Sequence, residues 1–210
     1  MRKKILEGRR VFLISRDVSS LVIDSLYELA VGGNAVVAYF YFDFAAQEEQ
    51  SPTIILGSML RQVVRGLDEI PERIAKAFRD RGKAIDSRRP AFSEIVGFLQ
   101  DISSSRCTFL CIDALDECPA EHRVKLLDSL NQILQKSPGA RIFLTGRSYI
   151  RSEVGKHLAG RAATRSITPA KDDIIIFLRV KLKEDTMPDA MDKSLEEEIL
   201  KKIPETVSEM

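Results

Sequence analysis

The residues best suited to chemistry are three carboxylates that follow a short apolar run. Residues 109–112 are apolar and lead directly into a segment that contains Asp113, Asp116 and Glu117. Such a run is typical of a parallel strand buried on both faces, whose carboxyl end opens where α/β folds bind ligands. We therefore expect Asp113 to hold Mg²⁺, and Asp116 and Glu117 to act catalytically on a water molecule. The alternative is an ordinary strand followed by a helix that begins with acidic residues.

A second short strand, predicted at residues 140–145, is followed by Gly146 and Arg147. Between the two strands, apolar residues recur at helical spacing, which completes a strand–helix–strand unit. The tips of neighbouring parallel strands lie at the same edge of a sheet, so Arg147 is suited to bind the terminal phosphate of a cofactor. The alternative is a surface salt bridge. In a chain without nucleotide, we expect Arg147 to pair with Asp113 or Asp116.

Both strand ends resemble motifs of a known family. Residues 113–117, Asp-Ala-Leu-Asp-Glu, resemble the extended Walker B motif of NACHT-type signal-transduction ATPases, which are P-loop NTPases of the STAND class. Residues 144–147, Leu-Thr-Gly-Arg, resemble the sensor 1 strand of the same proteins. Residues 19–24, 39–44 and 199–205 are similar to the nephrocystin-3-like N-terminal version of that domain, whose longer relatives carry C-terminal ankyrin or similar repeats.

This resemblance implies a fold and a role. The fold is a three-layer, P-loop NTPase-like α/β domain, with a parallel five-stranded sheet flanked by helices and strand 140–145 between the first strand and the Walker B strand. The cofactor is ATP or GTP with Mg²⁺. The role is a switch whose nucleotide state controls oligomerisation or access to partners.

The phosphate-binding loop of the family is missing from this sequence. Family members carry G-x-x-G-x-G-K-[ST] between the first strand and the first helix, where backbone N–H groups and a lysine hold the phosphates. Here the first strand, predicted at residues 10–14, is followed by only a few residues before a helical pattern begins. An ungapped comparison places the Gly-Lys-Thr positions on Ile14, Ser15 and Arg16, and none of these can replace its counterpart.

Losing the lysine and two or three N–H donors removes on the order of 5 kcal/mol of binding free energy, or about a thousandfold in affinity. We therefore expect no cofactor to be bound by this chain, which has NTPase ancestry but is inactive as written. The favoured function is a degenerate or truncated NACHT-type nucleotide-switch module that acts mainly through protein–protein contacts or self-association. The alternative is an active ATP- or GTP-binding signal-transduction NTPase, if an exon encoding the loop is absent. An unrelated small-molecule enzyme is disfavoured by the two strand-tip motifs.

Composition sets further limits. The chain has 210 residues, a formal net charge of +1, and 44% hydrophobic and 30% charged residues, which suits one globular core. A net charge near zero gives no global field to attract nucleic acid or an anionic membrane, so neither is an expected partner. The three cysteines are expected to be reduced and buried, in agreement with a cytoplasmic location. A zinc site is disfavoured, because His122 is the only nearby fourth ligand.

The rest of the chain alternates predicted helices and strands, as βαβ units require. We predict one NTPase-like domain at residues 1–183, followed at 184–210 by a linker and the start of a helical extension. Ser194 to Glu197 is predicted to form a capping box that opens this last helix. Both ends are expected to be truncated.

Overall fold

Two compact units make up the chain, Met1–Ser166 and Ile167–Met210. The computed structural model describes residues 10–15, 19–31, 35–83, 90–166, 171–184 and 192–208. The first unit contains the whole sheet, and the second contains the two last helices. The first unit ends before the domain boundary expected after residue 183, and that boundary stays a prediction.

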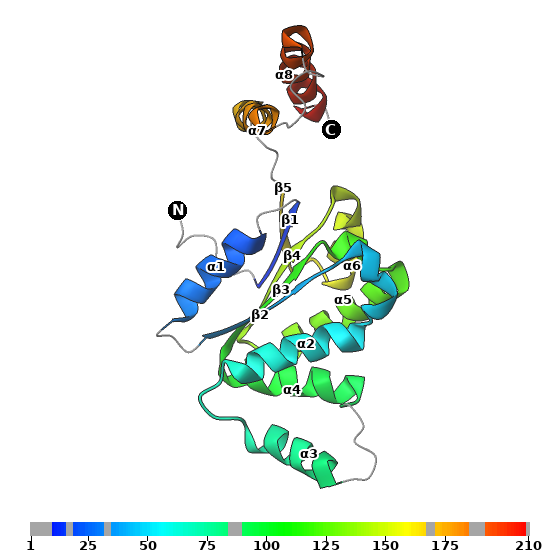
Figure 1. Ribbon diagram of the computed structural model, residues 1–210. Helices are drawn as coiled ribbons and strands as arrows, with labels where there is room; N and C mark the ends of the chain where they lie inside the picture. The colour runs from blue at the N-terminus through cyan, green and yellow to red at the C-terminus, as the bar shows by residue number, and fades with distance from the viewer. Residues whose placement is uncertain are drawn as a thin grey trace. The chain divides into compact units, whose positions relative to one another are not determined.

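The first unit is built on a parallel sheet of five strands in the order β2-β3-β4-β1-β5 (Figure 1). The strands are β1 (Val11–Ser15), β2 (Ala35–Tyr41), β3 (Cys107–Asp113), β4 (Ala140–Thr145) and β5 (Ala162–Ser166). The expected five-stranded sheet is therefore confirmed. Strand β4 pairs with both β3 and β1, so the expected position of the sensor strand is also confirmed.

Helices cover both faces of the sheet (Figure 1). Helix α1 (Ser19–Ala30) lies on one face, where Ile23 and Leu26 pack against Val37, Cys111 and Phe143 of the strands. The opposite face carries the larger core, formed with helices α2 (Pro52–Arg65), α4 (Phe92–Ser105), α5 (Ala120–Lys136) and α6 (Arg151–His157). Helix α3 (Glu72–Lys83) follows α2, and its Ile74 is buried in the same core.

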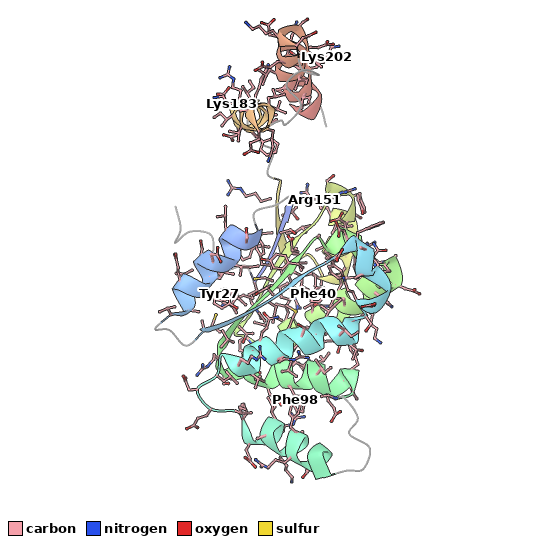
Figure 2. The ribbon with its side chains drawn as sticks, in the orientation of Figure 1. Tyr27, Phe40, Phe98, Arg151, Lys183 and Lys202 are labelled. Carbon is pink, nitrogen blue, oxygen red and sulfur yellow. The ribbon has the colours of Figure 1, made fainter. Side chains whose placement is uncertain are left out.

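The local sequence accounts for where these helices begin. The side chain of Ser51 accepts a hydrogen bond from the backbone N–H of Ile54 at 3.4 Å, and Pro52 occupies the first turn of α2. The apolar side chains of α2 recur at helical spacing, and one face of the helix is buried in the core. On α4, the ring of Phe98 packs in the core, with the guanidinium of Arg73 5.8 Å from its centre (Figure 2).

The side chain of Arg10 fastens the sheet to the end of α5. Its guanidinium donates hydrogen bonds to the carbonyl oxygens of Leu134 at 2.6 Å and Ala140 at 3.1 Å, and also to that of Ser137. Carbonyl groups at a helix end have no partner within the helix, and a cation also suits the negative end of the helix dipole. Burial lowers the pKa of Arg10 from its ordinary value, so part of this stabilisation offsets a desolvation cost.

The second unit consists of helices α7 (Lys171–Lys183) and α8 (Lys193–Ser208), which pack on each other. The capping box predicted at Ser194 is wrong. The carboxylate of Asp192 instead accepts a hydrogen bond from the backbone N–H of Leu195 at 2.7 Å, so the helix begins two residues earlier than a cap at Ser194 would place it. No helix in the described residues is long and apolar enough to cross a membrane.

Candidate functional site

The tips of β3 and β4 meet through the side chain of Thr145. Its hydroxyl donates a hydrogen bond to the carboxylate of Asp113 and accepts one from the backbone N–H of Ala114 at 2.9 Å. Thr145 is buried, so its hydroxyl is shielded from competing water. Sequence analysis did not single out Thr145, although a threonine at the end of an apolar strand beside an aspartate was a usable signal.

A left-handed residue turns the chain into the acidic segment. Ala114 has φ 52° and ψ 45°, a conformation that costs energy for a residue other than glycine, and it leads into the single turn η3 (Leu115–Glu117). Leu115 is fully buried and anchors that turn in the core. Gly146 lies opposite it, where a Cβ would lie 2.6 Å from Ile150 Cδ1 and 3.2 Å from Asp116 Oδ1. The acidic turn and the loop after β4 are therefore tightly apposed.

Arg147 pairs with Asp116, as expected for a chain without nucleotide. Its Nε lies 3.3 Å from Asp116 Oδ2, and its backbone N–H donates to Asp116 Oδ1 at 3.1 Å. The Asp116 side chain is only 7% exposed, whereas the Arg147 side chain is 76% exposed. The poorly exposed carboxylate therefore accepts a hydrogen bond from the backbone of Arg147 and pairs with its largely exposed guanidinium.

A second arginine, Arg123, also binds the acidic turn, and the sequence did not indicate this role. Arg123 of α5 donates to the carbonyl oxygens of Cys118 at 2.8 Å and Asp116 at 3.5 Å. Its Nε forms an ion pair with Glu153 of α6 at 2.9 Å, and the two side chains are 11% and 23% exposed. Arg123 thus joins the acidic turn, α5 and α6. Nothing local in the sequence pairs residues 123 and 153.

Two further side chains bind backbone carbonyls of the same turn. The amide of Gln47, from the short helix η2 (Phe44–Glu49), donates to Glu117 O at 2.7 Å. The hydroxyl of Tyr149, from η4 (Ser148–Ile150), donates to Asp116 O at 3.3 Å. Of the site residues expected from the sequence, Arg147 thus contacts Asp116, whereas Asp113 bonds to Thr145. The carboxylate of Glu117 forms no hydrogen bond or ion pair within the described part of the chain.

The connection between β1 and α1 is too short for a phosphate-binding loop. Strand β1 ends at Ser15 and α1 begins at Ser19, so residues 16–18 alone join them, and these lie outside the described residues. The ungapped comparison placed loop positions on Ile14 and Ser15, but both are strand residues, with Ile14 beside Thr145 of β4 and Ser15 beside Ser166 of β5. Sheet pairing therefore continues through two of the positions that the comparison assigned to the loop.

The residues at the strand tips do not fit a Mg²⁺–nucleotide. Magnesium at such a site needs an aspartate together with the serine or threonine of the phosphate loop, and that loop has no counterpart here. The carboxylate of Asp113 is bonded to the Thr145 hydroxyl, and that of Asp116 to Arg147. Among the described residues, no group of three or more His, Cys, Asp or Glu side chains is placed to hold a metal ion.

Comparison with protein families identifies the chain. Residues 18–147, more than half of its length, match the family described as Nephrocystin 3, N-terminal. The chain belongs to that family. The matched segment begins directly after the short β1–α1 connection and ends at Arg147, so it includes both strand-tip motifs. No curated protein matches the chain.

Solved structures place this member of the nephrocystin 3 N-terminal family among P-loop NTPase-like folds. It is similar to a chain in the structure of Drosophila ORC bound to DNA, with a TM-score of 0.53 and 12% identity over 92% of this chain and 46% of that chain. It also resembles Cdc6p from Pyrobaculum aerophilum (TM-score 0.49, 13% identity, 83% of this chain and 43% of that chain). A Walker-type ATPase of Pyrococcus abyssi is a third match (TM-score 0.48, 14% identity, 96% of this chain and 61% of that chain). The chain spans roughly half the length of these proteins.

Proposed function

We propose that this chain is a degenerate nucleotide-switch module of the NACHT type, in the STAND class, that binds neither ATP nor GTP and acts through protein contacts. The observation that carries this proposal is the connection of three residues between β1 and α1. A phosphate cradle needs a motif of eight residues at that position, because its backbone N–H groups must surround the phosphates. The missing cradle leaves the acids without the group that would bring a nucleotide to them.

The retained acids have a structural use in this proposal. Asp113 joins β3 to β4 through Thr145, and Asp116 fixes the loop after β4 through the backbone N–H of Arg147. Both contacts form within the chain and need no ligand. The strand-tip motifs are thus retained as parts of the fold, which suits a module whose surfaces bind protein partners or a second copy of itself.

The second candidate is an active signal-transduction NTPase, in which an additional exon supplies the loop. One observation favours it: β4 lies between β3 and β1, and Arg147 lies beside Asp116 at the strand tips. With a complete loop, Asp113 would hold Mg²⁺, Asp116 and Glu117 would act on water, and Arg147 would bind the terminal phosphate. The two candidates therefore differ in a single segment.

Inserting that segment tests the proposal. A variant that carries a Gly-rich, Lys-Thr-containing loop between Ser15 and Ser19 should gain micromolar affinity for Mg-ATP in calorimetry, and a further Asp113→Ala change should abolish it. A matched control carries an insertion of the same length made of glycine and serine. If the grafted chain folds and still binds no nucleotide, the short connection is not the reason for the lost affinity, and the proposal in this form fails.

The nature of the partners is part of the same proposal. We infer a cytoplasmic protein whose longer relatives continue into C-terminal repeats, with protein rather than nucleic acid as partner. Light scattering of the purified chain over a hundredfold range of concentration distinguishes self-association, which raises the mass, from contact with other proteins, which leaves a monomer. Anisotropy of a labelled DNA duplex should stay unchanged at the same protein concentrations.

A further inference from the structure

A pocket of about 480 Å³ lies along the free edge of β2, at the side of the sheet away from β3. We name it the β2 edge pocket. It is lined by the ends of α1 and α2 and by the first half of β2, including Tyr27, Val37, Tyr39, Gln62 and Arg65. Its volume is in the range of sites that bind ligands or peptide side chains.

The direction of the backbone N–H and C=O groups of β2 decides which of them face away from β3. In a parallel pair, alternate residues of a strand bond to one neighbour and the others face the opposite side. The N–H of Phe42 donates to Asp113 O at 3.2 Å, so the even-numbered residues of β2 bond to β3 and the odd-numbered ones face outward. Val37 and Tyr39 therefore present both their N–H and their C=O groups toward the pocket side.

Tyr39 and Val37 differ in whether their outward N–H and C=O groups have hydrogen-bond partners. The side-chain amide of Gln62 accepts from Tyr39 N–H at 3.1 Å and donates to Tyr39 O at 2.8 Å, as a residue of a neighbouring strand would. Val37 lines the pocket, and in the described part of the chain its outward N–H and C=O have no hydrogen-bond partner. A backbone pair of this kind is a template for an added strand. The outward backbone groups of Tyr39 are therefore paired, whereas those of Val37, which is 5% exposed, are not.

The side chains that line the pocket favour a ligand with both apolar and acidic groups. The rings of Tyr27 on α1 and Tyr39 on β2 meet edge to face with their centres 6.4 Å apart (Figure 2 labels Tyr27). Such a pair offers a large, rigid apolar surface with polar tips. Arg65 lies at the end of α2, forms no ion pair with any described residue, and is the only charged residue of the lining, which contains no Asp or Glu. The pocket is thus complementary to a negative group.

We propose that the β2 edge pocket binds an extended, acidic peptide segment of a partner protein. A residue of that segment hydrogen-bonds to the N–H and C=O of Val37, an apolar side chain contacts Tyr27 and Tyr39, and a carboxylate pairs with Arg65. The β2 residues that line the pocket run from Ala35 to Tyr39, which at roughly 3.3 Å per residue is the length of about four residues of an extended chain. The proposal rests on the proposed role in protein contact and gives it a surface remote from the strand-tip motifs.

Hydrogen exchange of the unliganded chain tests whether the outward amide of Val37 lacks a partner. Hydrogen exchange followed by NMR should show slow exchange for the amide of Tyr39 and at least about tenfold faster exchange for that of Val37. The variant Gln62→Ala should release Tyr39 without changing the amides of β3. If Val37 and Tyr39 exchange equally slowly in the native chain, the edge at Val37 is not available and the proposal fails.

The binding test uses a displayed library of random seven-residue peptides, selected on the full chain. Enriched sequences should alternate apolar and polar residues and contain Asp or Glu, and they should slow the exchange of the Val37 amide. Arg65→Glu should weaken their binding about tenfold. Arg61→Glu, on the same helix but outside the pocket lining, should leave the affinity unchanged.

A second variant addresses the backbone contact directly. Val37→Pro removes the outward N–H and should abolish binding. Because the Val37 side chain also packs in the core with Ile23 and Phe143, the thermal midpoint of this variant is measured first to show that it folds. Peptides that bind Arg65→Glu as tightly as the native chain, or no enrichment at all, would overturn the proposal. Because nucleotide binding is measured separately at the strand tips, failure here leaves the calorimetric test of the proposed function intact.

Discussion

The two arginines that contact the acidic turn should differ sharply in their effect on stability. Arg123→Ala removes the partner of Glu153 and two hydrogen bonds to the turn, from a side chain only 11% exposed. Removing one member of a largely buried ion pair costs roughly 3 kcal/mol, because the remaining charge stays in a poorly solvated site. Arg147 is 76% exposed, and an exposed pair contributes about 1 kcal/mol or less. Its backbone N–H bond to Asp116 also survives truncation to alanine.

We therefore expect Arg123→Ala to lower the free energy of unfolding of the first unit by about 3 kcal/mol, and Arg147→Ala by less than about 1 kcal/mol. Urea denaturation, read by hydrogen exchange of peptides from β3 and β4, measures the first unit separately from α7 and α8. The double variant Arg123→Met with Glu153→Gln should recover part of the loss, since it leaves no buried charge. Equal losses for Arg123→Ala and Arg147→Ala would refute the assignment of Arg123 as the main support of the turn.

Three further predictions concern other parts of the fold. Arg10→Ala should cost about 2 kcal/mol in urea denaturation, because the carbonyl groups of Leu134, Ser137 and Ala140 lose a charged donor, and Arg10→Lys should recover only part of it. Gly139→Ala should lower the free energy of unfolding by about 3 kcal/mol, since the new Cβ would lie 2.4 Å from a backbone oxygen. Gly155→Ala adds a Cβ with no atom within 4 Å, so it should stabilise α6 by about 0.5 kcal/mol and raise the thermal midpoint. Burial raises the pKa of the Cys111 thiol from 9.0 to about 12. The unfolded chain therefore loses this proton at lower pH than the folded chain, and the free energy of unfolding falls as pH rises between those values. Cys111→Ala should lessen the fall in the free energy of unfolding from pH 8 to pH 10 by about 1 kcal/mol.

The strands and helices were predictable because their signals are local, and the strand order was predictable because of the family resemblance. The apolar runs of β3 and β4 and the helical spacing between them identify a βαβ unit, and the strand-tip motifs indicate which strands are neighbours. The pairing of Arg147 with Asp116 followed from the same topology. These features depend on residue types that recur at fixed spacing along the chain.

Other features depend on contacts between distant residues and were not predictable. Arg123 and Glu153 come from two helices, and nothing in either segment indicates the partner. The extent of β1 was misjudged because Ser15 is held in the sheet by β5, far along the chain. The cap of α8 went to Asp192 rather than Ser194, because both residue types suit that position and the choice depends on where the helix starts.

Calorimetry of the native chain with Mg-ATP and with Mg-GTP tests the central claim most directly. Without a phosphate-binding loop, the chain should release or absorb no binding heat for either nucleotide at submillimolar concentration, and its thermal midpoint should stay unchanged in their presence. A micromolar dissociation constant that disappears in Asp113→Ala would contradict the account, because it would mean that the acids bind a Mg²⁺–nucleotide without the cradle.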